Sequence, residues 1–164
     1  MNAHINTAKV KRRKLWFHCI DELLSELERI EKAERTGRLR TTGNWSAGQI
    51  LAHLSAWIEY GWEGYPIGSP PFFIKWILVR MARRYIRKGM QAGVMIPRVE
   101  GGTMGQELMP TNEALSRLRK SLIRLQSAEK AMHDSPAFGP MSHEDRIQLN
   151  LRHAELHLSF LELE

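Results

Sequence analysis

Hydrophobic residues recur at helical spacing in five stretches of the chain, and most of these stretches lie between residues that start or stop helices. In the first stretch, the apolar residues of 20–30 share one face, and Gly37 follows as a stop signal. No stretch of useful length alternates polar and apolar residues, as a half-buried strand would. The pattern therefore predicts an all-α fold without repeats.

The second predicted helix has the best-marked beginning. Ser46 and Gln49 form a capping box, in which each side chain satisfies a free backbone N–H group at the helix start. Gly and Pro residues of segment 64–71 end this helix. We expect Thr111 to cap the fourth helix and Ser142 to open the fifth.

The third predicted helix, residues 72–88, is divided along its length. Its first half is almost wholly apolar, and we expect it to lie in the core. If its Phe and Trp residues were instead exposed, they would favour a homodimer. The second half carries cations on one face, namely Arg80, Arg83, Arg84, Arg87 and Lys88.

Two segments lack a helical pattern. Residues 1–18 form an extended or loosely helical lead-in, and residues 89–110 form a long connection rich in Gly and Met. Loops of this length inside compact domains are often lids or binding loops. With 164 residues and 43% of them hydrophobic, the chain is expected to form one domain over residues 1–164.

The composition favours a soluble cytoplasmic protein. A lone cysteine, Cys19, excludes an internal disulfide framework. The apolar patch at 15–20 is too short for a signal peptide. The longest apolar stretch, 70–82, is interrupted by Lys75 and Arg80, so we expect no transmembrane segment.

The net charge of +6 is unevenly distributed. One basic run covers residues 9–14, and the segment 64–99 has seven basic residues and no acidic one. Such surfaces attract nucleic acid, anionic lipid or anionic small molecules, although simple solvation is the favoured explanation for the first run. The last helix lacks the cysteines of a zinc finger, so no specific nucleic-acid partner is predicted.

Three histidines are candidate metal ligands. His153 and His157 are four residues apart, which places both imidazoles on one side of a helix. His53 has a similar place on the buried side of the second helix, and helical bundles often assemble metal sites from facing helices. The alternative is that each is a hydrogen-bonded, half-buried histidine without a metal.

Glu155 and the four other histidines are expected to be ordinary surface groups, whereas two polar residues are candidates for orienting the imidazoles. Glu155 lies two residues from each member of the pair, so it points to the opposite side of the helix and should be solvated. Gln49 and Glu59 are guesses for groups that orient the imidazoles. The remaining histidines are predicted at the surface, namely His4, His18, His133 and His143.

Two motifs resemble a known superfamily. The segment from Asn44 to Leu54, N-W-S-A-G-Q-I-L-A-H-L, is similar to the second-helix signature of the DinB/YfiT-like putative metalloenzymes. The turn F-G-P-M-S at 138–142 and the sequence R-H-A-E-L-H-L at 152–158 resemble the last-helix signature of one uncharacterised branch. Residues 45–66 and 135–161 fit the pattern, whereas 67–110 fits loosely.

The resemblance implies a four-helix bundle with an up-down-down-up path and a three-histidine metal site at His53, His153 and His157. Superfamily members with known activity include thiol-dependent transferases and a mycothiol-dependent maleylpyruvate isomerase. The branch itself implies no particular reaction.

Three protein ligands leave a coordination position for water or substrate, as in catalytic zinc sites. Zinc or nickel is the expected ion, and imidazole also accepts manganese or iron. We therefore expect a metal-dependent transferase or hydrolase for a small thiol or electrophile, with Arg80, Arg84 and Arg87 binding substrate carboxylates. The alternative is a non-catalytic scaffold in which a structural metal or a histidine cluster stabilises the bundle.

Overall fold

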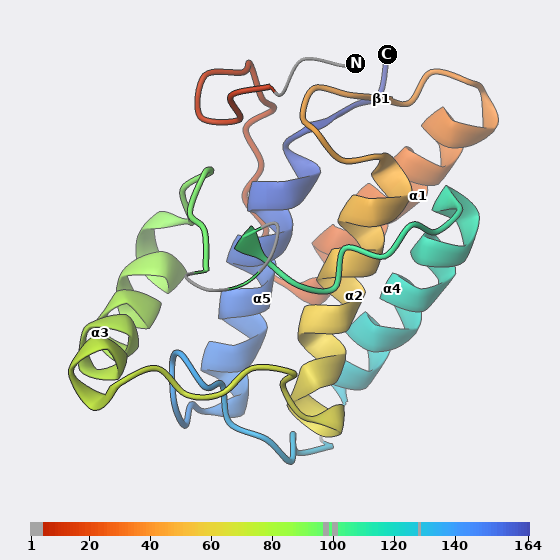
Figure 1. Ribbon diagram of the computed structural model, residues 1–164. Coiled ribbons are helices and arrows are strands. Elements are labelled where there is room, and N and C mark those ends of the chain that lie inside the picture. The colour runs from red at the N-terminus through yellow and green to blue at the C-terminus, as the bar shows by residue number, and fades with distance from the viewer. Residues whose placement is uncertain (1–4, 97–98, 100–101, 128) are drawn as a thin grey trace.

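The computed structural model describes residues 5–96, 99, 102–127 and 129–164, and within them the protein is mainly helical (Figure 1). The elements in chain order are α1 (Ile20–Arg35), β1 (Arg40–Thr41), α2 (Ala47–Glu63), α3 (Phe72–Lys88), α4 (Thr111–Gln126), α5 (His143–Leu158) and β2 (Leu161–Glu162). The predicted all-α class is confirmed. The sequence pattern missed a short antiparallel pairing, in which Arg40 faces Glu162 and Thr41 faces Leu161.

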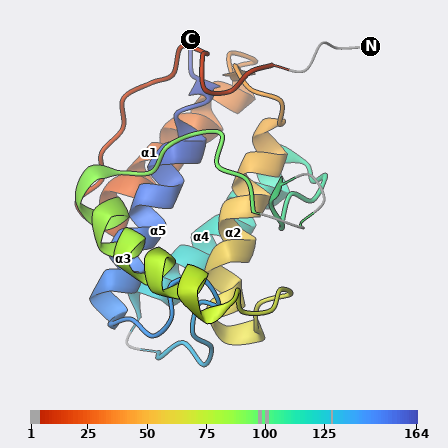
Figure 2. The same cartoon turned by 60° about the vertical axis from the view of Figure 1, so that its left-hand side comes forward.

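Four helices surround the core. α1 and α2 each pack against both α4 and α5, and the α2–α4 contact is the most extensive. α3 lies outside this group and contacts α5 (Figures 1 and 2). The core is built from the apolar stripes of the four helices, including Leu27, Leu51, Leu122 and Leu158, all of which are fully buried.

Local signals position the helices that matter for the site. Ser46 accepts a hydrogen bond from the Gln49 backbone N–H at 3.2 Å, and the Gln49 side chain accepts one from Ser46 N–H at 3.0 Å, so the capping box is confirmed. Ser142 accepts from Asp145 N–H and starts α5 as predicted. The expectation for Thr111 was wrong, because it is the first helical residue and the preceding Pro110 caps without a side-chain bond.

The described part of the lead-in, residues 5–18, packs on the bundle without forming a helix. Phe17 is buried, and Arg13 forms an ion pair with the buried Glu26 at 2.6 Å while also donating to the Leu158 carbonyl oxygen at 3.1 Å. Arg12 donates to Ser159 Oγ at 3.1 Å. Simple solvation of the basic run was therefore the wrong expectation for these two arginines, whose charges and donors are used in packing.

The apolar half of α3 is exposed rather than buried, contrary to the sequence-based expectation. α3 contacts α5 with its inner side, and Ala82 is the residue of this helix that is buried there. No helix in the described part of the chain combines the length and hydropathy that crossing a membrane requires.

Candidate metal centre

The fold brings His53 of α2 together with His153 and His157 of α5. One ring nitrogen from each residue lies within 4.8 Å of the other two. Nε2 of His53 is 3.1 Å from Nε2 of His153, and the His53 and His157 ring centroids are 4.5 Å apart. Imidazole nitrogens at about 2.0–2.1 Å from a tetrahedral ion are separated by roughly 3.3 Å, so small side-chain adjustments suffice for common coordination.

A backbone carbonyl fixes the protonation of His53. Nδ1 of His53 lies 2.6 Å from the Met104 carbonyl oxygen, which can only accept a hydrogen bond. Nδ1 therefore carries the proton and donates it, and the lone pair of Nε2 faces the other two histidines. This is the outer-shell arrangement typical of metal-binding histidines, so the donor set fits a divalent ion.

Gly105 allows the loop to come close enough for this contact. A Cβ atom at residue 105 would lie 2.7 Å from Ala56 Cβ and 3.8 Å from His53 Cα. Its φ of +74° also lies in the left-handed region that favours glycine. The long loop 89–110 therefore contributes to the site through its backbone. A backbone carbonyl has no sequence signature, although the glycine-rich loop marked the region.

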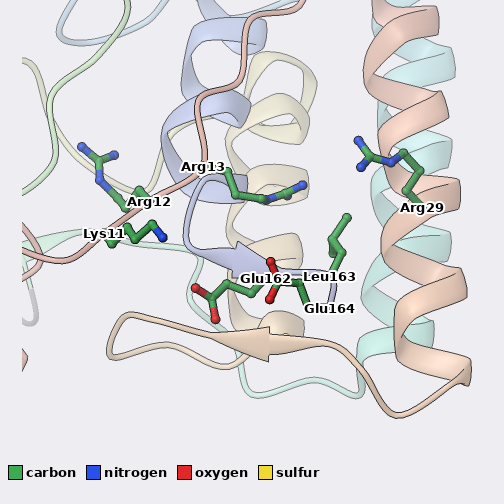
Figure 3. Close-up of a pocket in the computed structure, with 7 residues that line it drawn as sticks. All are labelled: Lys11, Arg12, Arg13, Arg29, Glu162, Leu163 and Glu164. Atoms are coloured by element: carbon green, nitrogen blue, oxygen red, sulfur yellow. The ribbon is translucent and has the colours of Figure 1, made fainter.

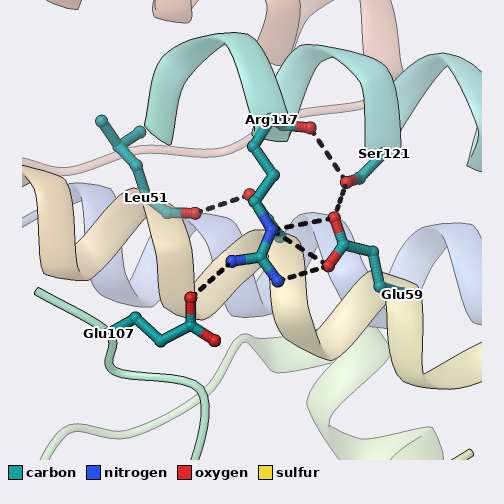
Figure 4. A network of polar contacts seen from close by, with 6 residues as sticks. Leu51, Glu59, Glu107, Arg117 and Ser121 are labelled. Carbon is teal, nitrogen blue, oxygen red and sulfur yellow. Dashed lines mark hydrogen bonds and ion pairs between the residues drawn. The ribbon is translucent and has the colours of Figure 1, made fainter. Parts of the chain in front are cut away.

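An ion-pair network anchors the same loop (Figure 4). Arg117 of α4 donates to both carboxylate oxygens of Glu59 and to Glu107, which follows Met104 by three residues. Ser121 also donates to Glu59 at 2.8 Å. Arg117 therefore joins α4 to α2 through Glu59 and to the loop through Glu107. Glu59 is used in this network rather than in orienting an imidazole, so that guess was wrong. The guess for Gln49 was wrong too, because its side chain completes the capping box.

Burial keeps the imidazoles neutral. Desolvation lowers the pKa of His53 to about 4 and lowers the pKa of His153 and of His157 well below the ordinary value, with the neighbouring histidines adding to the effect on the latter two. Neutral imidazole is the form that binds metals. His53 is fully buried, whereas His153 and His157 keep partial exposure.

Aromatic rings surround the histidines. Trp45 stacks on His157 with nearly parallel rings 5.4 Å apart, and Trp57 contacts His53 and His153 at centroid distances of 6.0 and 5.7 Å. In the described part of the chain, the buried indole N–H of Trp57 has no hydrogen-bond partner. The sequence reasoning missed both tryptophans as neighbours of the site.

Glu155 is buried, which corrects the prediction of a solvated charge. It accepts a hydrogen bond from Phe17 N–H at 2.5 Å and pairs with the buried Arg152 at 3.1 Å. Arg152 in turn donates to the Phe17 carbonyl oxygen and lies over the Trp16 ring. Burial raises the pKa of Glu155. The side of α5 opposite the histidines thus holds the lead-in segment, not solvent.

The predicted substrate arginines of α3 are exposed. Arg80 lies over the Trp76 ring at 5.2 Å, and Arg87 donates to the Arg83 carbonyl oxygen. Within the described residues, Arg80, Arg84 and Arg87 form no hydrogen bond or ion pair with the site histidines, and their role in substrate binding stays a prediction.

A separate cavity of about 290 Å³ lies between the lead-in, α1 and the last residues of the chain (Figure 3). Lys11, Arg12, Arg13 and Arg29 line it together with Glu162 and Glu164, and none of the three site histidines does. Carboxylates among the cations leave this cavity without a clear preference for anions.

Comparison with known families gives one match. A family described as "Protein of unknown function (DUF1569)" matches residues 9–164. The chain belongs to this family. Searches of curated proteins and of solved structures find no match. All three histidines lie within the matched DUF1569 region.

Proposed function

We propose that this DUF1569 protein binds a divalent metal ion through His53, His153 and His157 and uses it in catalysis on a small molecule. The observation that carries the proposal is the lone pair of His53 Nε2, which the Met104 carbonyl directs toward two further imidazoles. Zinc and nickel suit this donor set first, followed by manganese and iron. The motif resemblance to DinB-like metalloenzymes supports the same ligand set.

Three imidazoles leave at least one coordination position for a guest. When bound there, a divalent ion supplies the Lewis acidity that promotes loss of a proton from a thiol or water. We infer a transferase or hydrolase reaction on a small thiol or electrophilic substrate.

The protein's own residues prepare this position. Met104 holds the Nδ1 proton of His53, while Trp45 and Trp57 give the site an apolar wall that limits access of water. The free indole N–H of Trp57 is available as a donor to a polar guest.

Elemental analysis of the purified protein tests metal binding. We expect about one divalent ion per chain in the wild type and loss of that ion in His153→Ala. His143→Ala is the matched control, because it removes an imidazole from the start of the same helix outside the cluster. Equal metal contents in the two variants would refute the site.

A second experiment separates catalysis from a structural role. Cobalt-substituted protein is titrated with 2-mercaptoethanol, whose thiolate shifts the visible absorption if it enters an open position. A non-catalytic histidine cluster has one observation in its favour, the hydrogen-bonding distance of 3.1 Å between His53 and His153. An unchanged spectrum would favour a non-catalytic site. Unfolding on removal of the metal would then indicate a structural metal, whereas a stable fold with no metal bound would indicate the hydrogen-bonded histidine cluster.

A further inference from the structure

The first half of α3 exposes large apolar side chains to solvent. Phe72 is 85% exposed, Phe73 56%, Trp76 64% and Ile77 51%. The opposite side of the helix packs on α5, so these residues have no place in the bundle core. A contiguous aromatic patch of this kind is uncommon on soluble proteins and marks a contact surface.

The second half of α3 continues the same outer face with cations. Arg80, Arg83, Arg84 and Arg87 are all exposed, and at 100° per residue they fall on the side that also carries Phe73 and Trp76. Segment 64–99 contains no acidic residue. Within the described residues, no carboxylate pairs with any of these four arginines, so their charge is available to a partner.

We propose that α3 docks on the surface of a membrane that contains anionic phospholipid. Such a surface offers acyl chains for Phe73 and Trp76 and negative headgroups for the arginines. The residues from Phe73 to Arg84 span roughly 16 Å along the helix axis at 1.5 Å per residue. A tilted helix therefore places its aromatic end about 5–10 Å into the headgroup boundary while its cationic end stays among the headgroups.

Charge complementarity favours a membrane over a second copy of the chain. In a two-fold dimer with antiparallel α3 helices, the aromatic half of one copy would face the arginines of the other. With parallel helices, arginines would face arginines, and each chain already carries a net charge of +6. The proposal goes beyond the metal centre and does not depend on it.

Co-sedimentation with lipid vesicles tests the proposal. Vesicles of phosphatidylcholine alone are compared with an equal mixture of phosphatidylcholine and phosphatidylserine, at low and at moderate salt. We expect binding to the mixed vesicles, weakened by salt. Brominated acyl chains in these vesicles should quench Trp76 fluorescence, and the quenching should disappear in Trp76→Ser.

Matched variants give the expected size of the effect. Removing two cations in Arg84→Gln with Arg87→Gln should weaken binding roughly 25-fold, at about five-fold for each charge. The control, Lys120→Gln with Lys130→Gln, loses the same charge at exposed positions elsewhere and should change binding little. Phe73→Ser should weaken binding, whereas Ile123→Ser, at an exposed position of α4, should not.

Three outcomes would overturn the proposal. One is equal vesicle binding by the variant with Arg84→Gln and Arg87→Gln and by the control with Lys120→Gln and Lys130→Gln. The second is no vesicle binding combined with a dimer that Trp76→Ser dissociates. The third is binding to an acidic protein or to RNA in the absence of any affinity for the mixed vesicles.

Discussion

Replacing Gly105 with alanine tests whether the loop backbone controls the proposed metal site. Gly105 has a φ of +74°, and the added Cβ would meet Ala56 Cβ at 2.7 Å. This distance is shorter than non-bonded carbon atoms adopt, so either α2 or the loop must move. Because Met104 precedes Gly105, movement of the loop withdraws the carbonyl that accepts from His53 Nδ1.

The size of the effect follows from these two changes. A left-handed backbone costs a residue with a Cβ about 1–2 kcal/mol, and overpacking adds about 1–3 kcal/mol. We therefore expect Gly105→Ala to lower the free energy of unfolding by roughly 2–5 kcal/mol. Loss of an outer-shell partner typically reduces metal affinity about 10–100-fold, and we expect zinc affinity to fall by this factor.

Gly37→Ala is the matched control. Its φ of +67° imposes a similar backbone cost, but an added Cβ has no neighbour within 4 Å. Zinc affinity is measured by competition with a chelating indicator, and stability by urea unfolding of the metal-free proteins. Equal zinc affinity in Gly105→Ala and Gly37→Ala would show that the Met104 carbonyl does not govern the binding of His53.

Three other perturbations have defined outcomes. Metal-free protein should lose stability in acid, because the pKa of His53 is about 4 in the fold and 6.5 when unfolded. The unfolded chain therefore binds a proton first as the pH falls below about 6.5, and the free energy of unfolding should be about 2 kcal/mol lower at about pH 5. Glu155→Ala leaves the buried charge of Arg152 unpaired and should cost about 3–5 kcal/mol in urea unfolding. Gly48→Ala would place a Cβ 1.9 Å from the Met109 carbonyl oxygen and should cost at least about 1–3 kcal/mol in the same assay.

Each of these predictions has a control. His53→Asn removes the imidazole, so it should lose less stability in acid than the wild type, and identical losses would contradict the assigned cause. Glu155→Gln keeps an acceptor for Phe17 N–H and should be milder than Glu155→Ala. Gly68→Ala adds a Cβ in open space and should be near neutral, unlike Gly48→Ala.

Features that depend on neighbours in the chain were predicted well. The capping box at Ser46, the cap at Ser142 and the helical apolar stripes act within a few residues, so the elements they mark follow from local sequence. The same holds for His153 and His157, because helical spacing alone places them together.

Features that depend on which surfaces meet were predicted poorly, apart from the meeting of His53 with His153 and His157, which the motif resemblance implied. Glu155 is buried because the lead-in segment covers its side of α5, and the apolar half of α3 is exposed because that helix lies outside the bundle. Neither fact has a local signal, since the same residue pattern fits a buried or an exposed face.

The sequence by itself determined the helices and the pairing of two histidines on α5, since backbone hydrogen bonds and side-chain periodicity act over one or two turns. The tertiary structure decided that His53 joins that pair and that the carbonyl of Met104 directs its lone pair. His53 lies about a hundred positions from His153 and about fifty from Met104 along the chain. These contacts therefore exist only after α2, α5 and the 89–110 loop pack together.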